Sequence, residues 1–220
     1  MRAQHGDAEL VLSSANTFSY DKRQSTVRAY IATDMSVPWT SYFDACSHNC
    51  TSAADVDAAA EAELPALAPP SADSLYYAFG DHHRPELWGF LDAYVRPPWL
   101  DATRIGSLSF GLGAHGSGVP FHTHGPVFAE VMYGAKRWFI SAPGKAPEFD
   151  PNTTTVAWLR ERERRSAAGD VGEVSADSRE EEEVEILECT LAYGDVLYLP
   201  DAWWHATLNI GQTVFISTFV

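Results

Sequence analysis

Three histidines have the residue type and spacing that could hold a metal ion. His122 and His124 are separated by one residue, and alternate side chains of a β-strand leave the same face, so both imidazoles would point to one side. His205 follows two tryptophans in a distant strand-like stretch. Two ligands from one strand and one from another are typical of a metal-binding β-barrel. We therefore predict a metal site at His122, His124 and His205.

The ligand set does not identify the metal, because imidazole suits iron, zinc, copper and nickel alike. Three neutral imidazoles also leave the charge of a divalent ion uncompensated, whereas a site with one carboxylate would bind the ion more tightly. The alternative is that each histidine is a hydrogen-bonded structural residue, which is the usual role of a lone histidine in a strand.

A lysine and two tyrosines near these strands could contact a ligand. Lys136 is either an exposed lysine of a turn, as a single lysine usually is, or a buried cation that pairs with a substrate carboxylate, which would offset its desolvation. Tyr133 and Tyr198 could reach the pocket with a hydroxyl group, but strand alternation alone does not show which face they take.

Composition excludes several classes of protein. The 220 residues carry a net charge of −15, and residues 170–188 contribute nine acidic side chains against one arginine. An acidic chain without a basic stripe is a poor candidate for binding nucleic acid. No apolar run approaches the ~18 residues that span a bilayer, so we expect no membrane span; the oligomeric state stays open.

Cellular location rests on weak signals. The first residues lack the apolar core of a signal peptide, so the protein is either cytosolic or the sequence begins after its targeting segment. Asn49 and Asn152 each begin a glycosylation tripeptide, which favours a secretory lumen. The chain has three cysteines, Cys46, Cys50 and Cys189. Cys46 and Cys50 could form a small disulfide loop, remain free thiols or contribute to a partial metal site, and the metal site is the least favoured of these alternatives.

Short apolar runs separated by glycine and proline dominate the second half of the chain. We expect strands at 75–80, 107–112, 128–133, 137–141, 186–190, 196–199, 203–208 and 213–220, with a hairpin turn at 134–136. Helices are expected at 85–94 and 153–165. This pattern predicts a mainly β fold with peripheral helices, a double-stranded β-helix of the jelly-roll or cupin kind.

The expected organisation is a single domain over residues 1–220. Residues 1–100 would supply strand and helix elements with an Ala/Pro-rich insertion near 51–74. Residues 101–220 would form the β-helix core, with an acidic loop near 166–185.

Four motifs together resemble the JmjC family: residues 116–122, 134–139, 194–200 and 203–206. The likeness extends to most of the chain, with gaps at the Ala-rich stretch and the acidic loop. It implies a JmjC-type β-helix that binds Fe(II) and 2-oxoglutarate and hydroxylates a protein side chain, or demethylates one through hydroxylation. By position, His122 and His205 match two metal ligands, and Lys136 matches the lysine that pairs with the far carboxylate of 2-oxoglutarate.

The resemblance also implies a partner class and a location. We assign Lys136 and Tyr133 as cofactor-binding residues, with Fe(II), or zinc, as the metal and a protein as substrate or partner. The subgroup that the chain resembles is associated with the lumen of the endoplasmic reticulum. Two positions depart from the family pattern, because His124 replaces the usual Asp or Glu and Val119 replaces a hydroxyl-bearing residue. The alternative is therefore a catalytically silent JmjC module that binds proteins.

Overall fold

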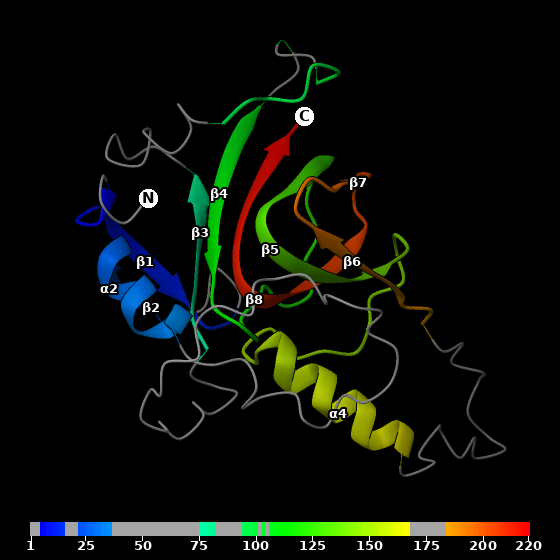
Figure 1. Ribbon diagram of the computed structural model, residues 1–220. Helices are drawn as coiled ribbons and strands as arrows, with labels where there is room; N and C mark the ends of the chain where they lie inside the picture. Colours follow the sequence, from blue (N-terminus) through cyan, green and yellow to red (C-terminus); the bar gives the residue numbers. More distant parts are fainter. Residues whose placement is uncertain are drawn as a thin grey trace, which may run out of the picture.

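The computed structural model describes residues 5–15, 22–36, 75–81, 94–100, 103, 106–167 and 184–220. The strands are β1 (Glu9–Ser13), β2 (Lys22–Thr26), β3 (Tyr77–Asp81), β4 (Ser107–Gly113), β5 (Val127–Ser141), β6 (Leu187–Ala192), β7 (Val196–Leu199) and β8 (Trp204–Phe219). The helices are α2 (Val27–Ala32), the short 3-10 helix η1 (Asp34–Ser36) and α4 (Thr155–Ala167). The predicted mainly β fold with peripheral helices is thereby confirmed (Figure 1).

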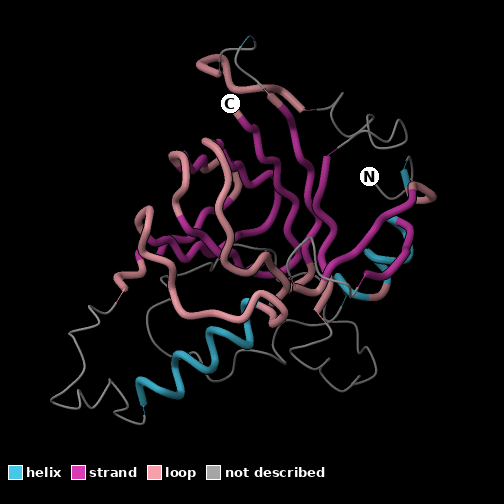
Figure 2. The backbone as a smooth tube through the Cα atoms, turned by 180° about the vertical axis from the view of Figure 1, so that it is seen from behind, coloured by secondary structure: helices cyan, strands magenta, loops and turns pink. Residues whose placement is uncertain are grey.

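One curved antiparallel sheet contains all of these strands. Its order is β2-β1-β3-β4-β8-β5-β6, and β7 pairs with β5 outside that path. One edge of β5 pairs with β8 along most of its length. The other edge pairs first with β7 and then with β6. Because β5 and β8 both curve strongly (Figure 1; seen from behind in Figure 2), the sheet folds back over its own concave face.

A turn was predicted at residues 134–136, and this prediction is wrong. The chain continues through Gly134 as one strand, with register shifts between Val131 and Tyr133 and between Tyr133 and Ala135. Gly134 has a φ of +76°, and a Cβ there would lie 2.1 Å from the carbonyl oxygen of Gln212. Close approach of the two backbones and an irregular register therefore produce a bend rather than a hairpin.

The two strands expected at 203–208 and 213–220 are likewise one strand, β8. It bends at Gly211, where φ is +68°. The interruptions expected at 134–136 and between 208 and 213 contain these two glycines, but the pairing of β5 with β8 carries each strand across its interruption.

Register decides which side chains share the concave face. Residues directly opposite each other in paired strands lie on the same face, and β5 and β8 place Ile140 opposite His205, Trp138 opposite Thr207 and Lys136 opposite Asn209. The intervening residues face the other way and pack against α4. That second cluster includes Phe139, Val156, Leu159, Ala206 and Leu208.

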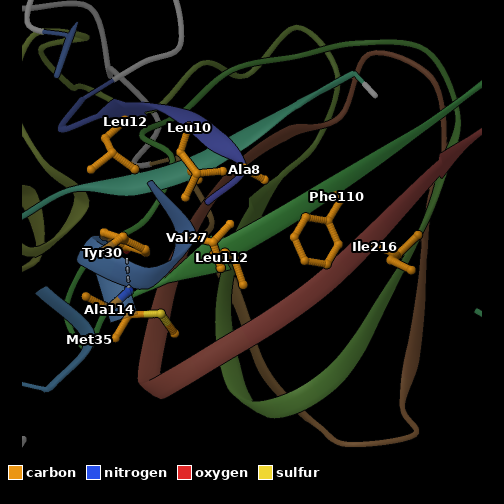
Figure 3. Packing of buried hydrophobic residues seen from close by; sticks show 11 residues of the cluster. Ala8, Leu10, Leu12, Val27, Tyr30, Met35, Phe110, Leu112, Ala114 and Ile216 are labelled. Carbon is orange, nitrogen blue, oxygen red and sulfur yellow. Dashed lines mark hydrogen bonds between the residues drawn. The ribbon is translucent and has the colours of Figure 1, made fainter. Parts of the chain in front are cut away.

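The outer face of the other half of the sheet is covered by α2. Figure 3 shows this cluster, in which Leu10, Val27, Leu112 and other buried residues surround Tyr30. The Tyr30 hydroxyl donates to the carbonyl of Tyr76 at 2.6 Å and accepts from the backbone N–H of Ala114 at 2.9 Å. These bonds satisfy the buried hydroxyl and fix the start of the segment that leads to His122.

Other expectations have mixed outcomes. Helix α4 begins at Thr155, and the Thr154 hydroxyl accepts from the N–H of Ala157, as expected for a cap. Strand β7 lies where it was predicted.

Several predictions lie outside the described residues. They concern the Ala/Pro-rich insertion, Cys46 and Cys50, nearly all of the helix at 85–94 and most of the acidic loop. Among the helices that the structure describes, none is long and apolar enough to cross a bilayer. The single-domain organisation stays a prediction.

Candidate metal centre

Backbone pairing places the first and third histidines side by side. His122 and His205 form an antiparallel bridge, in which the N–H of His122 donates to the carbonyl of His205 at 3.1 Å and the reverse bond measures 3.0 Å. Two residues that exchange both bonds direct their side chains to the same face. The ring centroids accordingly lie 4.2 Å apart.

His124 joins them from the same extended segment. It lies two residues after His122, so its imidazole leaves the same face. Its carbonyl accepts from the N–H of Ala202 at 3.1 Å, and Ala202 has a φ of +59°, which is uncommon for a residue other than glycine. This turn brings the start of β8 back against His124, whose ring centroid lies 4.5 Å from that of His205.

The three imidazoles are held in one tautomer. In each ring, Nδ1 contacts a backbone carbonyl oxygen close by in the chain. The contact of His122 with Pro120 measures 2.8 Å, and the contact of His124 with Gly125 measures 2.7 Å. The contact of His205 with Trp203 measures 2.9 Å. A carbonyl oxygen can only accept, so each Nδ1 carries the proton. Each Nε2 is therefore an unprotonated lone-pair donor, and bonding of the other ring nitrogen to a carbonyl is typical of histidines that bind metals.

The lone pairs converge on one point. Nε2 of His124 lies 3.0 Å from Nε2 of His205, an unfavourable contact between two neutral imidazoles unless a cation or proton lies between them. The three ligand atoms all lie within 4.8 Å of one another. A metal at about 2.1 Å from each nitrogen would bring every pair within about 4.2 Å, which is close to the observed spacing. The histidines fit a metal ion.

Burial keeps the ligands neutral. It lowers the pKa of His122 to about 4, with smaller contributions from His124 and Lys136. Burial also lowers the pKa of His124, and it lowers that of His205 well below its usual value, with the neighbouring histidines adding to the effect. Neutral imidazole is the form that binds metals.

Lys136 is a buried amine on the same concave face. Its side chain is 2% exposed, and complete burial holds its pKa well below the usual value. Nζ donates to Oδ1 of Asn209 at 3.3 Å and lies 3.3 Å from the centroid of the Phe215 ring. No carboxylate pairs with Nζ in the part of the chain that the structure describes.

A tryptophan ring connects this lysine to the histidines. The Trp138 ring lies 6.0 Å from Nζ of Lys136 and 5.9 Å, between centroids, from the ring of His205. The structure thus brings four of the predicted site residues to one face. Tyr133 is 55% exposed, so its side chain lies at the surface, and a cofactor role for it stays a prediction.

Sequence reasoning missed Thr207, Asn209 and Trp138, all of which line the same face. The available signal was their alternation with His205 and Lys136 along the two strands. Asn209 is fully buried, and its Nδ2 donates to the Ser117 hydroxyl at 3.1 Å.

The profile of the JmjC domain matches residues 104–220. JmjC domain-containing protein 8 of Mus musculus is 40% identical over 218 residues, which are 99% of this chain and 65% of the mouse protein. The Homo sapiens protein of the same name is 38% identical over 220 residues, with 99% and 67% coverage. The chain therefore spans about two thirds of the length of these relatives.

Solved structures are more distant. An oxalate decarboxylase of Bacillus subtilis aligns with 66% of this chain and 25% of its own, at 12% identity and a TM-score of 0.34. A cupin superfamily protein of Desulfitobacterium hafniense aligns with 58% of this chain and 82% of its own, at 13% identity and a TM-score of 0.30.

Proposed function

Because the chain belongs to the JmjC domain family, we propose that it binds Fe(II) through His122, His124 and His205 and acts as a 2-oxoglutarate-dependent oxygenase on a protein side chain. The observation that carries this proposal is the convergence of three unprotonated Nε2 atoms on the face that also buries Lys136.

The choice of iron rests on the JmjC family. The three imidazole ligands are compatible with it, because imidazole nitrogen binds iron as well as zinc and copper.

The charges support an anionic cosubstrate. Three neutral imidazoles leave a divalent metal ion uncompensated, and Lys136 adds a buried amine without a carboxylate partner among the described residues. A ligand with two carboxylates would satisfy both positions, one at the metal and one at Nζ. 2-Oxoglutarate has these groups at the two ends of a short chain.

The chain's own residues hold and orient the reactants. Iron(II) with 2-oxoglutarate, when bound, would supply the activation of O2 and the transfer of one oxygen atom to a C–H bond. The carbonyls of Pro120, Gly125 and Trp203 fix the three rings through Nδ1. Lys136 would pair with the far carboxylate, which would require the Phe215 ring to turn away from Nζ, 3.3 Å from its centroid.

A protein in the lumen of the endoplasmic reticulum is the proposed substrate. Asn152, the only glycosylation asparagine within the described residues, is exposed in the turn before α4. A glycan there would extend into solvent, which is compatible with a luminal location.

A second candidate function is a catalytically silent module that binds proteins. The observation that favours it is Phe215, whose ring lies against Lys136 and fills the slot left by Gly111, where a Cβ would lie 2.0 Å from the ring. In this reading the ring permanently replaces the cosubstrate. A row of rings, formed by the exposed Trp99 and Tyr198 on either side of the half-buried Phe128, with centroids 5.0 and 4.8 Å apart, would offer a surface to a partner.

The test is an anaerobic titration of the Fe(II)-loaded protein with 2-oxoglutarate, followed by calorimetry and by the metal-to-ligand absorption band. Wild type should bind one equivalent, His124→Ala should lose iron, and Lys136→Met should keep iron while losing most affinity for 2-oxoglutarate. Iron binding without any 2-oxoglutarate binding would overturn the oxygenase and favour the silent module. Failure of wild type to bind any divalent metal would overturn the metal site itself.

A further inference from the structure

Thr207 lies between the metal ligands and the buried lysine. It follows His205 by two residues on β8 and stands opposite Trp138, while Lys136 stands opposite Asn209 two residues further along. His205, Thr207 and Asn209 thus share the concave face. The side chain of Thr207 is 2% exposed, so its hydroxyl is removed from bulk water.

Hydrogen bonds orient this hydroxyl but leave its proton unused. Oγ1 of Thr207 accepts from the N–H of Val119 at 3.1 Å, and the backbone N–H of Thr207 donates to the carbonyl of Val119 at 2.9 Å. The two contacts fix the side chain against the segment that carries His122. Within the described residues, the hydroxyl proton has no acceptor. A buried donor without an acceptor costs free energy that a ligand could recover.

Neighbouring polar groups bond to other partners among the described residues. Oδ1 of Asn209 accepts from Lys136, and Nδ2 of Asn209 donates to Ser117. Nε1 of Trp138 is a buried donor that also finds no acceptor among the described residues. Donors therefore outnumber acceptors along this face, as expected where an anion binds.

Val119 lies beside Thr207 and brings no hydroxyl of its own. Its backbone N–H donates to Oγ1 of Thr207, and its aliphatic side chain offers no hydrogen bond. A carboxylate accepts about four hydrogen bonds, and the ammonium of Lys136 alone would leave several of them unmade.

We propose that Thr207 donates a hydrogen bond to the carboxylate that pairs with Lys136, so that the hydroxyl missing at position 119 is supplied from the neighbouring strand. This inference rests on the proposed function. It makes Thr207 a cosubstrate-binding residue and predicts selectivity for acids with a second, distant carboxylate.

The experiment compares Thr207→Val, which keeps the shape and removes the hydroxyl, with Thr207→Ser, which keeps the hydroxyl. Dissociation constants for 2-oxoglutarate and for 2-oxobutyrate, which lacks the far carboxylate, are measured anaerobically on the Fe(II)-loaded proteins. The valine variant should bind 2-oxoglutarate about 10- to 100-fold more weakly, whereas the serine variant should stay within about threefold of wild type. Binding of 2-oxobutyrate and of iron should be unchanged in both.

Thr218→Val is the matched control, because Thr218 is fully buried on the same strand but faces the other side of the sheet. It should leave 2-oxoglutarate binding unchanged. Equal binding of 2-oxoglutarate by wild type and Thr207→Val would overturn this inference alone. A parallel loss of 2-oxobutyrate or iron affinity would also overturn it, because the role would then be structural. Absence of 2-oxoglutarate binding by wild type would overturn the proposed function and this inference together.

Discussion

Replacement of Lys136 by methionine should stabilise the metal-free protein. Lys136 is 2% exposed, and burial holds its pKa well below the usual value. An unpaired buried ammonium costs several kcal/mol. Methionine has a similar length and does not carry that cost. A core substitution normally destabilises, so a gain in stability would mark the lysine as retained for binding rather than for folding.

The magnitude follows from what the lysine contacts. Its removal forfeits the cation–π contact with Phe215, which is worth about 2 kcal/mol when desolvated. It also leaves Oδ1 of Asn209 without its donor, at about 1 kcal/mol. Subtracting these from a desolvation cost of about 4–5 kcal/mol leaves a net gain of about 1–2 kcal/mol in the free energy of unfolding. For a chain of this size, each kcal/mol raises Tm by about 2–4 °C.

The gain should depend on pH with a definite sign. The folded pKa of Lys136 is depressed, so between it and the unfolded value near 10.5 the unfolded state binds the extra proton. The stability of wild type therefore rises with pH across that window. The advantage of Lys136→Met should be largest at low pH and should shrink as the pH approaches 10.5.

Urea unfolding of the metal-free proteins between pH 6 and 10 measures this effect. Lys145→Met is the matched control, because Lys145 is exposed and its replacement should change stability by less than about 0.5 kcal/mol. A loss of about 2–5 kcal/mol in Lys136→Met at every pH, as for an ordinary core truncation, would refute the reasoning.

Three further predictions test the site and the segment that carries it. Divalent metal at one hundred times its dissociation constant should raise the free energy of unfolding of wild type by about 2.7 kcal/mol, a shift that thermal denaturation of His205→Ala should lack. Burial lowers the pKa of His115 to about 4 from 6.5. The contribution of neutral His115 to the free energy of unfolding, at most about 3 kcal/mol, is therefore complete above pH 6.5 and is lost as the pH falls towards 4. In urea titrations, His115→Asn should lose less stability than wild type over that window, because its amide oxygen can still accept from the N–H of Gly211. A Cβ at Gly118 would lie 1.8 Å from the carbonyl oxygen of Thr207. Gly118→Ala should therefore lower the free energy of unfolding by about 1–3 kcal/mol or more and weaken metal binding in a calorimetric titration. Gly80→Ala is the control, because a Cβ there has nothing within 4 Å, and it should leave metal affinity unchanged.

The sequence predicted the histidine site because the relevant rule is local. Two residues separated by one position share a face in any extended segment, and this is how His122 and His124 lie. His205 came from its place after two tryptophans, and the backbone bridge to His122 then fixed it. The mainly β architecture was predictable for the same reason, since short apolar runs and turn residues can be recognised without tertiary information.

The burial of Lys136 could not be predicted in this way. It depends on whether the chain turns or continues at Gly134, and only the pairing of β5 with β8 decides that. Thr207 and Asn209 were missed for a related reason. A polar residue at every second position of a strand looks like a solvent-facing pattern until the partner strand and the covering layer are known.

The bridge between His122 and His205 has a consequence for how the protein would acquire its metal. Two ligands are fixed by backbone hydrogen bonds and all three rings by carbonyls, so the ion need not organise its own site. A preformed site of neutral nitrogen ligands discriminates weakly between ions of similar radius, and its intrinsic preference follows the general order in which copper and zinc exceed iron. Which ion occupies it in a cell would then be decided by the concentrations in the compartment where the chain folds, and incorrect metalation would be a natural way to switch the protein off.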